Sequence, residues 1–212
     1  MNTQTQPLAL TGPAGAIEAL LDLPEPEHFP RPLGTVVIAH PHPQFGGTMT
    51  NKVVQTIARA AVQAGWRAVR FNFRGVGQSA GTYDEGRGEA DDMRAVIDQT
   101  APADQPLALA GFSFGAHIAS QAIGTLHPTR ALARIVLVGT AASRFAVPPV
   151  PAELHPVTLV VHGEHDDTVP LDAVMQWARP QVLPVTVVPS GGHFFHGQLP
   201  LLKSLVMRHM HA

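Results

Sequence analysis

The chain has 212 residues with a formal net charge of −2, and 14% of its residues are charged while 45% are hydrophobic. This length fits one core, so we predict a single domain over residues 1–212. The chain contains no cysteine, which excludes disulfides, thiolate metal sites and a cysteine nucleophile. The near-neutral charge and the lack of a basic run argue against a nucleic-acid partner.

The first residues contain no basic start leading into an apolar run, so we predict no signal peptide. No stretch approaches the roughly 18 uninterrupted apolar residues that a membrane-spanning helix needs. We therefore expect a cytoplasmic protein with no membrane partner.

Short apolar segments alternate with segments of helical period along the chain. The first two apolar segments, 8–10 and 16–21, flank a Gly-Pro-Ala-Gly turn and predict an antiparallel hairpin, followed by a proline-rich surface connection over 23–33. Further strands are predicted at 35–39, 66–73, 107–110, 135–138, 157–162 and 185–188. Helices are predicted at 51–64, 89–100, 114–123, 171–178 and the C-terminal end. This alternation predicts an α/β fold, a mostly parallel sheet with helices on both faces.

A serine between two glycines stands where a predicted strand meets a predicted helix. The motif is Gly111-Phe112-Ser113-Phe114-Gly115. A G-x-S-x-G turn in this context lifts a serine hydroxyl clear of the sheet, and its glycines are needed because the turn has no room for side chains. The alternative is a turn in which Ser113 only caps the following helix. We favour a nucleophile.

A nucleophilic serine needs a base and a third group that orients the base. The loop after 157–162 supplies Asp166, and the loop after 185–188 supplies His193. The chain order Ser113, Asp166, His193, each after its own strand, is the order of α/β-hydrolases. We predict these three residues as the catalytic residues.

Neighbouring residues leave alternatives for the acid and the base. Asp167 and Glu164 are close to Asp166, but Asp167 has the simpler interpretation of a carboxylate near a helix start. His193 follows two glycines that free its loop, whereas His196 is expected almost one turn into the next helix. His117, four residues after Ser113, is expected to pack rather than react.

The chain resembles small bacterial α/β-hydrolases without a cap domain, related to dienelactone hydrolases and carboxylesterases. The resemblance extends over roughly residues 35–200. Its motifs are His40-Pro41-His42-Pro43, Gly46-Gly47-Thr48-Met49, Asn72-Phe73-Arg74-Gly75-Val76-Gly77-Gln78-Ser79, the serine motif, Gly163…Asp166…Val169-Pro170 and Gly192-His193-Phe194-Phe195. The resemblance implies an α/β-hydrolase fold, with Ser113, Asp166 and His193 as nucleophile, acid and base. It also implies esterase-type activity on a small-molecule ester, often in a homodimer.

Many relatives carry His-Gly-Gly-Gly where this chain has two prolines, which have no N–H to donate to an oxyanion. We expect the backbone N–H groups of His42 and Phe114 to form the oxyanion hole. The segment 140–156 is too short for a lid domain, so the site should be open to solvent. Five phenylalanines either wall an apolar pocket or belong to the core: Phe45, Phe112, Phe114, Phe194 and Phe195.

Two competing sites find weak support. The histidine pairs His40/His42 and His162/His165 lack a fuller ligand pattern, and the glycines at 75, 77 and 81 are spaced wrongly for a dinucleotide loop, so we predict no metal and no cofactor. The sequence therefore predicts a serine hydrolase that cleaves small carboxylic esters or thioesters through an acyl-enzyme. The alternatives are a non-catalytic hydrolase-fold binding protein and a peptidase of the same fold.

Overall fold

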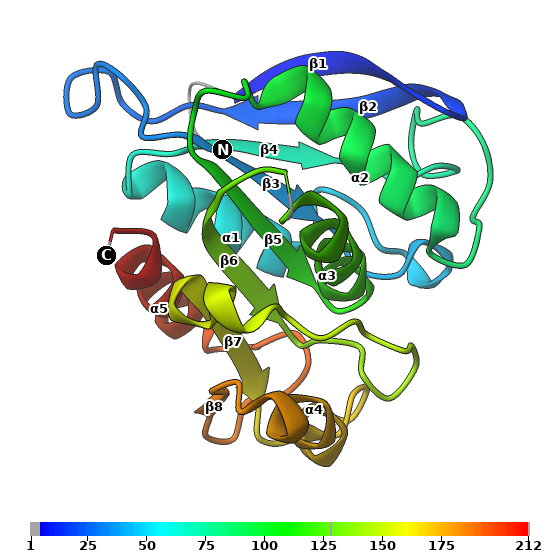
Figure 1. Cartoon of the computed structure of the whole chain (residues 1–212), viewed down its shortest axis with the longest axis vertical. Helices are drawn as coiled ribbons and strands as arrows, with labels where there is room; N and C mark the ends of the chain where they lie inside the picture. Colours follow the sequence, from blue (N-terminus) through cyan, green and yellow to red (C-terminus); the bar gives the residue numbers. More distant parts are fainter. Residues whose placement is uncertain (1–4, 128, 212) are drawn as a thin grey trace.

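The computed structural model describes residues 5–127 and 129–211. Its sheet has eight strands in the order β1-β2-β4-β3-β5-β6-β7-β8 (Figure 1). The strands are β1 (Thr5–Gly12), β2 (Gly15–Asp22), β3 (Thr35–Ala39), β4 (Arg67–Phe71), β5 (Leu107–Phe112), β6 (Leu132–Val138), β7 (Thr158–Gly163) and β8 (Thr186–Val188). Strands β3 to β8 pair in parallel, while β1 and β2 form an antiparallel hairpin whose second strand pairs antiparallel with β4. The predicted mostly parallel sheet with an N-terminal hairpin is confirmed.

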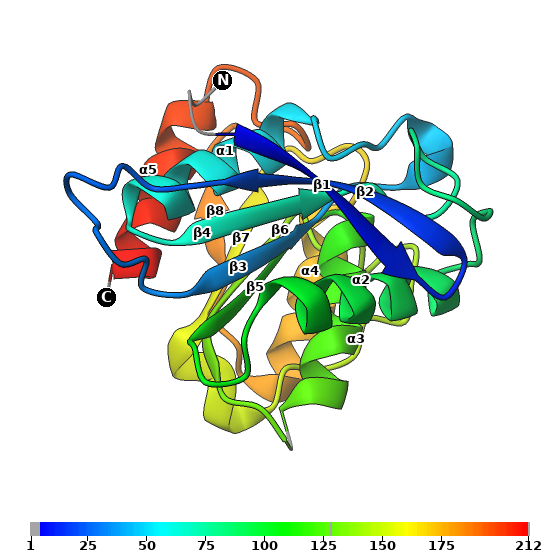
Figure 2. The same cartoon turned by 90° about the horizontal axis from the view of Figure 1, so that it is seen from above.

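Helices cover both faces of the sheet (Figure 2). One face packs against α1 (Lys52–Gln63) and α5 (Leu199–His211), and the other against α2 (Arg87–Thr100), α3 (Phe114–Leu126) and α4 (Leu171–Ala178). Each face has its own apolar cluster, and every residue of the central strand β5 is buried. A strand buried on both faces must be a continuous apolar run, which is why 107–112 shows no polar alternation.

Local interactions move several element boundaries from their predicted positions. Helix α2 begins two residues earlier than the apolar period indicates, because the carboxylate of Glu89 accepts hydrogen bonds from the amides of Asp84 and Gly86. Strand β4 is shorter than the predicted 66–73. Three short 3-10 turns, which carry no hydrophobic period, were not predicted. They are Pro43–Phe45, Ala152–Val157 and Arg179–Gln181.

The carboxyl ends of the parallel strands meet at one edge of the sheet, where α/β proteins place their chemistry. The residues that follow β3, β5, β7 and β8 at this edge include His40, Ser113, Asp166 and His193. No helix within residues 5–127 and 129–211 has the length and apolar character needed to cross a membrane. The fold therefore gathers the predicted site residues at one edge.

Candidate active site

Ser113 forms a sharp turn between β5 and α3. Its backbone has φ +57° and ψ −115°, a conformation that residues other than glycine rarely adopt. The Ser113 amide donates to the Val138 carbonyl at 2.8 Å, which ties the turn to the end of β6. A strained backbone held in this way places the serine hydroxyl above the sheet edge.

The two glycines of the serine motif are required by close backbone contacts. A Cβ atom on Gly111 would collide with the carbonyl of Gly115, and a Cβ on Gly115 would collide with the carbonyl of Ala39. The turn is therefore packed against the end of β3 as well as against its own helix. This confirms the prediction that the turn has no room for a side chain at the two glycine positions, 111 and 115.

We expect Gly115→Ala to lower the free energy of unfolding by about 1–3 kcal/mol, because backbone must move to admit the new methyl group. Gly124 lies in the same helix with nothing near its Cβ position, and it serves as the matched control. Gly124→Ala is expected to raise the free energy of unfolding by about 0.5–1 kcal/mol. Urea unfolding of both variants measures the difference. Equal stability of Gly115→Ala and the unmodified chain would contradict the close packing.

Three side chains from separate loops form a continuous hydrogen-bonded chain. The Ser113 Oγ lies 3.1 Å from the His193 Nε2, and the His193 Nδ1 lies 2.7 Å from the Asp166 Oδ2. A carboxylate only accepts hydrogen bonds, so the His193 Nδ1 carries the proton and Nε2 is left to accept from the serine hydroxyl. The three residues that the sequence predicts are therefore in contact, in the predicted order.

The Asp166 carboxylate is buried but well satisfied. Its Oδ1 accepts from the amides of Thr168 at 2.9 Å and Val169 at 2.7 Å, while Oδ2 faces His193. Burial acts to raise the pKa of Asp166, but the hydrogen bonds from His193 and Val169, with the nearby imidazoles, outweigh it and leave this pKa below its usual value. Asp166 is thus held as an anion beside the imidazole.

The alternative acids and base lie away from this chain of contacts. Asp167 is exposed, and its carboxylate accepts from the Thr168 hydroxyl at 3.3 Å. Glu164 accepts from the amide of Ser190 at 2.8 Å, which joins the loop after β7 to the loop after β8. His196 is exposed in the turn before α5, so its predicted position inside the next helix is wrong. The two glycines before His193 and the turn after it explain why the helix starts later.

A second buried histidine, which the sequence did not predict in this role, supports Asp166. The His162 Nε2 donates to the Val169 carbonyl at 2.8 Å and lies 3.5 Å from the Asp166 Oδ2. Burial lowers the pKa of His162, so the ring is neutral. Its position four residues before Asp166, at the end of a buried strand, is the one signal that could have indicated this contact.

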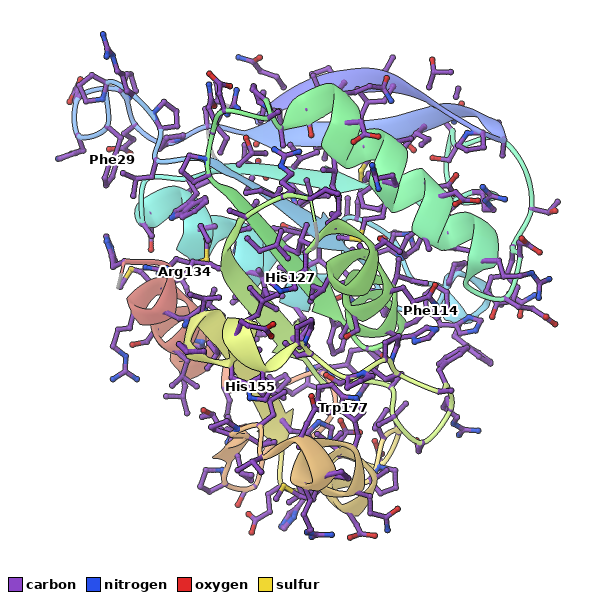
Figure 3. All side chains as sticks on the ribbon, in the orientation of Figure 1. Phe29, Phe114, His127, Arg134, His155 and Trp177 are labelled. Carbon is purple, nitrogen blue, oxygen red and sulfur yellow. The ribbon has the colours of Figure 1, made fainter. Side chains whose placement is uncertain are left out.

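Two backbone amides beside Ser113 are available to a ligand. Among residues 5–127 and 129–211, neither the His42 amide nor the Phe114 amide donates to another residue. Phe114, labelled in Figure 3, is the first residue of α3, so its N–H lies at the positive end of the helix dipole. The His42 and Phe114 rings are 5.0 Å apart, which brings the two segments together beside the serine.

His40 fixes the loop that carries His42. The His40 Nδ1 lies 2.6 Å from the Pro41 carbonyl, and the His40 Nε2 accepts from the Phe73 amide at 3.1 Å. Burial lowers the pKa of His40 to about 4, so the ring is neutral and its Nδ1–H is the donor. This bridge between the loops after β3 and β4 holds the His42 backbone in place without a glycine-rich segment.

The five phenylalanines that the sequence assigns either to a pocket wall or to the core differ in their exposure to solvent. Phe112, Phe114 and Phe195 are completely or almost completely buried, whereas Phe45 and Phe194 are exposed. Four rings contact the Phe114 ring, and the sequence did not predict this set: His42, Tyr83, His117 and Phe145. The expected opening to solvent applies to Phe45 and Phe194, whereas Ser113 and His193 are buried.

His117 packs, as predicted. Its ring stacks on Phe145 at 4.9 Å, and its Nε2 accepts from the Gln121 side chain at 2.8 Å. Burial lowers the pKa of His117 to about 4. Ser113 and His193 are themselves buried, with 7% and 3% of their surface exposed.

The competing metal and dinucleotide sites gain no structural support. In the described part of the chain, no three side chains of metal-binding type gather in one place. His162 is buried while His165 is exposed. The glycine loop after β4 packs on the N-terminal hairpin, where a Glu18 carboxylate oxygen accepts from the Gln78 amide at 2.9 Å. Residues 82–86 separate Gly81 from the start of α2, whereas a dinucleotide loop opens directly into its helix.

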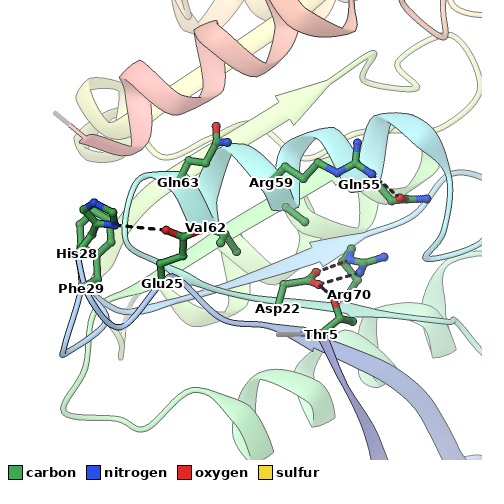
Figure 4. Close-up of a pocket in the computed structure, with 11 residues that line it drawn as sticks. Thr5, Asp22, Glu25, His28, Phe29, Gln55, Arg59, Val62, Gln63 and Arg70 are labelled. Atoms are coloured by element: carbon green, nitrogen blue, oxygen red, sulfur yellow. Dashed lines mark hydrogen bonds and ion pairs between the residues drawn. The ribbon is translucent and has the colours of Figure 1, made fainter. Parts of the chain in front are cut away.

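A cavity of about 620 Å³ lies elsewhere, between α1 and the segment that follows β2 (Figure 4). Its floor holds the ion pair of Arg70 and Asp22, in which the Arg70 Nε lies 2.7 Å from the Asp22 Oδ2. Asp22 pairs with Ala68 near the start of β4, so this cavity lies toward the amino ends of the strands. None of the residues that line this cavity belongs to the serine–histidine–aspartate contacts.

The sheet order, the serine turn after β5 and the absence of an inserted domain in the short segment after β6 define an α/β-hydrolase without a lid. Comparison with family models matches residues 30–183 to the family described as serine aminopeptidase, S33. The chain belongs to this family, and it is a member of the serine hydrolases of this fold.

Solved structures agree with this assignment. XC6422 from Xanthomonas campestris, described as an α/β serine hydrolase without lid, has a TM-score of 0.85 and 36% identity, covering 99% of this chain and 94% of that chain. A serine hydrolase homologue from Coxiella burnetii has a TM-score of 0.78 and 34% identity, covering 98% and 97%. The uncharacterized protein RP471 of Rickettsia prowazekii (strain Madrid E) is 41% identical over 115 residues, 53% of this chain. That match spans 47% of the curated relative's length.

Proposed function

We propose that the chain hydrolyses small carboxylic esters or thioesters through an acyl-enzyme, with Ser113 as nucleophile, His193 as base and Asp166 as the orienting acid. The observation that carries the proposal is the pair of hydrogen bonds that joins these side chains, 3.1 Å and 2.7 Å long. Three loops that are distant in sequence converge to make these hydrogen bonds. A turn in which Ser113 only caps a helix would not require a histidine and an aspartate in line with its hydroxyl.

In the first half of the reaction, the Ser113 oxygen attacks the ester carbonyl while His193 takes the serine proton at Nε2. The imidazolium that forms is stabilised by Asp166, whose carboxylate is held ionised by the Val169 amide and by His193 itself. His193 then gives the proton to the departing oxygen of an alcohol or, in a thioester, to the departing sulfur of a thiol. The acyl group remains on the serine.

The negative charge on the carbonyl oxygen needs donors during this attack. The amides of His42 and Phe114 are the candidates, since both lack a partner within residues 5–127 and 129–211 and Phe114 stands at a helix N-terminus. In the second half, water attacks the acyl-serine carbonyl, His193 takes the water proton, and the serine leaves with that proton restored.

The family description makes an aminopeptidase the second candidate. An aminopeptidase must bind the charged amino end of a peptide, whereas an esterase binds an uncharged acyl group. Burial lowers the pKa of His42 and of His117 and raises that of Tyr83, so all three rings are neutral at neutral pH. Neutral rings contact the apolar acyl group of an ester by dispersion, and the comparison of esters with aminoacyl anilides tests this preference.

We expect the protein to hydrolyse p-nitrophenyl butyrate and butyryl thioesters, and to release p-nitroaniline from alanyl, leucyl or prolyl p-nitroanilides at least about a hundredfold more slowly. Initial rates on both substrate series measure this ratio. Faster turnover of the anilides would identify a peptidase. A folded protein that hydrolyses neither series, and is not labelled by a fluorophosphonate at Ser113, would instead be a binding protein of this fold.

A further inference from the structure

Two exposed phenylalanines flank the proposed catalytic residues. All nine phenylalanines of the chain lie in its described part, and only Phe45 and Phe194 have exposed side chains, at 85% and 44%. A large apolar side chain gains nothing for folding when it stays in water, so both rings at one site call for another explanation.

Each ring contacts a residue of the proposed machinery. The Phe45 ring lies 4.9 Å from the ring of His42, whose amide is a candidate oxyanion donor. The Phe194 ring lies 5.0 Å from the ring of His193 and nearly perpendicular to it. Strands β3 and β8, which precede these two residues, lie on opposite sides of β5 in the sheet. The two phenyl rings therefore stand on opposite sides of Ser113.

The backbone holds both rings in place. Phe45 ends a 3-10 turn that is closed by Gly46, which has φ +76° and donates its N–H to the Pro43 carbonyl. Phe194 precedes Phe195, a completely buried residue with φ +52°. Because the Phe195 ring is fixed in the core in an unfavourable backbone conformation, its neighbour Phe194 is directed out beside His193.

The reaction chemistry distinguishes the two sides. His193 must reach the leaving oxygen to return the proton, so the alcohol part of an ester departs on the His193 side, next to Phe194. The acyl part then extends toward His42 and Phe45. We propose that Phe45 binds the acyl group and Phe194 binds the alcohol group of an uncharged ester that is apolar on both sides of the scissile bond. This inference rests on the proposed ester hydrolysis and names its substrate class.

The surroundings of the Phe45 side fit an apolar acyl chain. Beyond Phe45, the His42 ring contacts Tyr83 at 4.9 Å, Phe114 at 5.0 Å and Phe145 at 6.0 Å. None of these rings carries a charge at neutral pH, since burial lowers the pKa of His42 and raises that of Tyr83. The ring layer offers an acyl chain dispersion contacts, and the Glu89 and Glu85 carboxylates lie near enough to Tyr83 to add to the rise in its pKa.

Three esters with aliphatic alcohols test the two contacts separately: ethyl butyrate as reference, ethyl octanoate with a longer acyl group, and octyl butyrate with a longer alcohol. We expect Phe45→Ala to lower the ratio of kcat/KM for ethyl octanoate over the reference by about tenfold, the effect of one to two buried methylene groups, and to leave the octyl butyrate ratio unchanged. We expect Phe194→Ala to do the reverse. Val182→Ala, with a side chain 83% exposed at the end of the turn after α4, is the control and should change neither ratio.

A second measurement uses the acyl-enzyme, which has lost its alcohol. The deacylation rate of octanoyl-enzyme, followed after a burst from p-nitrophenyl octanoate, should change in Phe45→Ala and stay unchanged in Phe194→Ala. Unchanged ratios in both variants, or equal losses on both long esters, would overturn the assignment while ethyl butyrate hydrolysis upheld the proposed function. If the unmodified protein hydrolyses none of the three esters, the proposed function itself is overturned.

Discussion

Replacement of Ser113 by alanine is expected to lower kcat/KM for p-nitrophenyl butyrate by about four to six orders of magnitude. The substitution removes the only atom that can form the acyl-enzyme, and the Oγ contact that is lost is the one to His193. The fold should be retained, because the turn is held by the hydrogen bond from the Ser113 backbone N–H to the Val138 carbonyl and by the close contacts of the two glycines. The Ser113 hydroxyl is not needed for either. Initial rates and urea unfolding of the same preparation measure both effects.

Ser120 provides the control for this substitution. It is a completely buried serine on the same helix, and its hydroxyl donates to the Ala116 carbonyl at 2.9 Å. Ser120→Ala should keep turnover within about threefold and cost about 0.5–1.5 kcal/mol of stability for the lost hydrogen bond. Wild-type turnover in Ser113→Ala, with a normal unfolding curve, would place the nucleophile at another residue.

The second large effect is expected in the loop after β7, where two adjacent aspartates differ in environment. Asp166→Asn should lower kcat by about four orders of magnitude, because an amide that donates to the His193 Nδ1 favours the wrong imidazole tautomer. Asp167→Asn should change kcat by less than about threefold, since Asp167 is exposed and bonds only to its neighbour's hydroxyl among the described residues.

Both substitutions replace a carboxylate by its isosteric amide in one loop, so they serve as controls for each other. Their rates on p-nitrophenyl butyrate are compared at a pH where the unmodified protein is fully active. The reverse ranking would move the acid to Asp167. Equal large losses would indicate that the loop needs its charge rather than one oriented carboxylate.

The catalytic candidates could be predicted from the sequence because each is local to a strand end. Ser113 follows a continuous apolar run and stands between two glycines, while Asp166 and His193 follow their own runs. Parallel strands bring such positions to one edge whatever the exact order of the strands. The sheet therefore converts three local signals into one site, and small errors in strand boundaries do not affect the outcome.

The surroundings of the site could not be predicted in the same way. Tyr83 and Phe145 come from irregular segments without a hydrophobic period, and only the folded chain shows that they meet His42 and Phe114. For His162, the four-residue spacing to Asp166 is the only signal in the sequence, and it does not specify the contact by itself. Long-range side-chain contacts of this kind depend on packing, which residue spacing does not specify.

The hairpin that opens the chain leaves the eight-residue strand β1 at one border of the sheet, while the opposite border is the three-residue strand β8. A long unpaired border can recruit a strand from another molecule and start aggregation. Proline in such a strand sits with its nitrogen away from the ladder, so Pro7 removes one donor from the side of β1 that faces away from β2. Replacing this proline by a β-branched residue would therefore restore one donor for intermolecular strand addition at a border where the Gln99 side chain already occupies the N–H and carbonyl of Thr11.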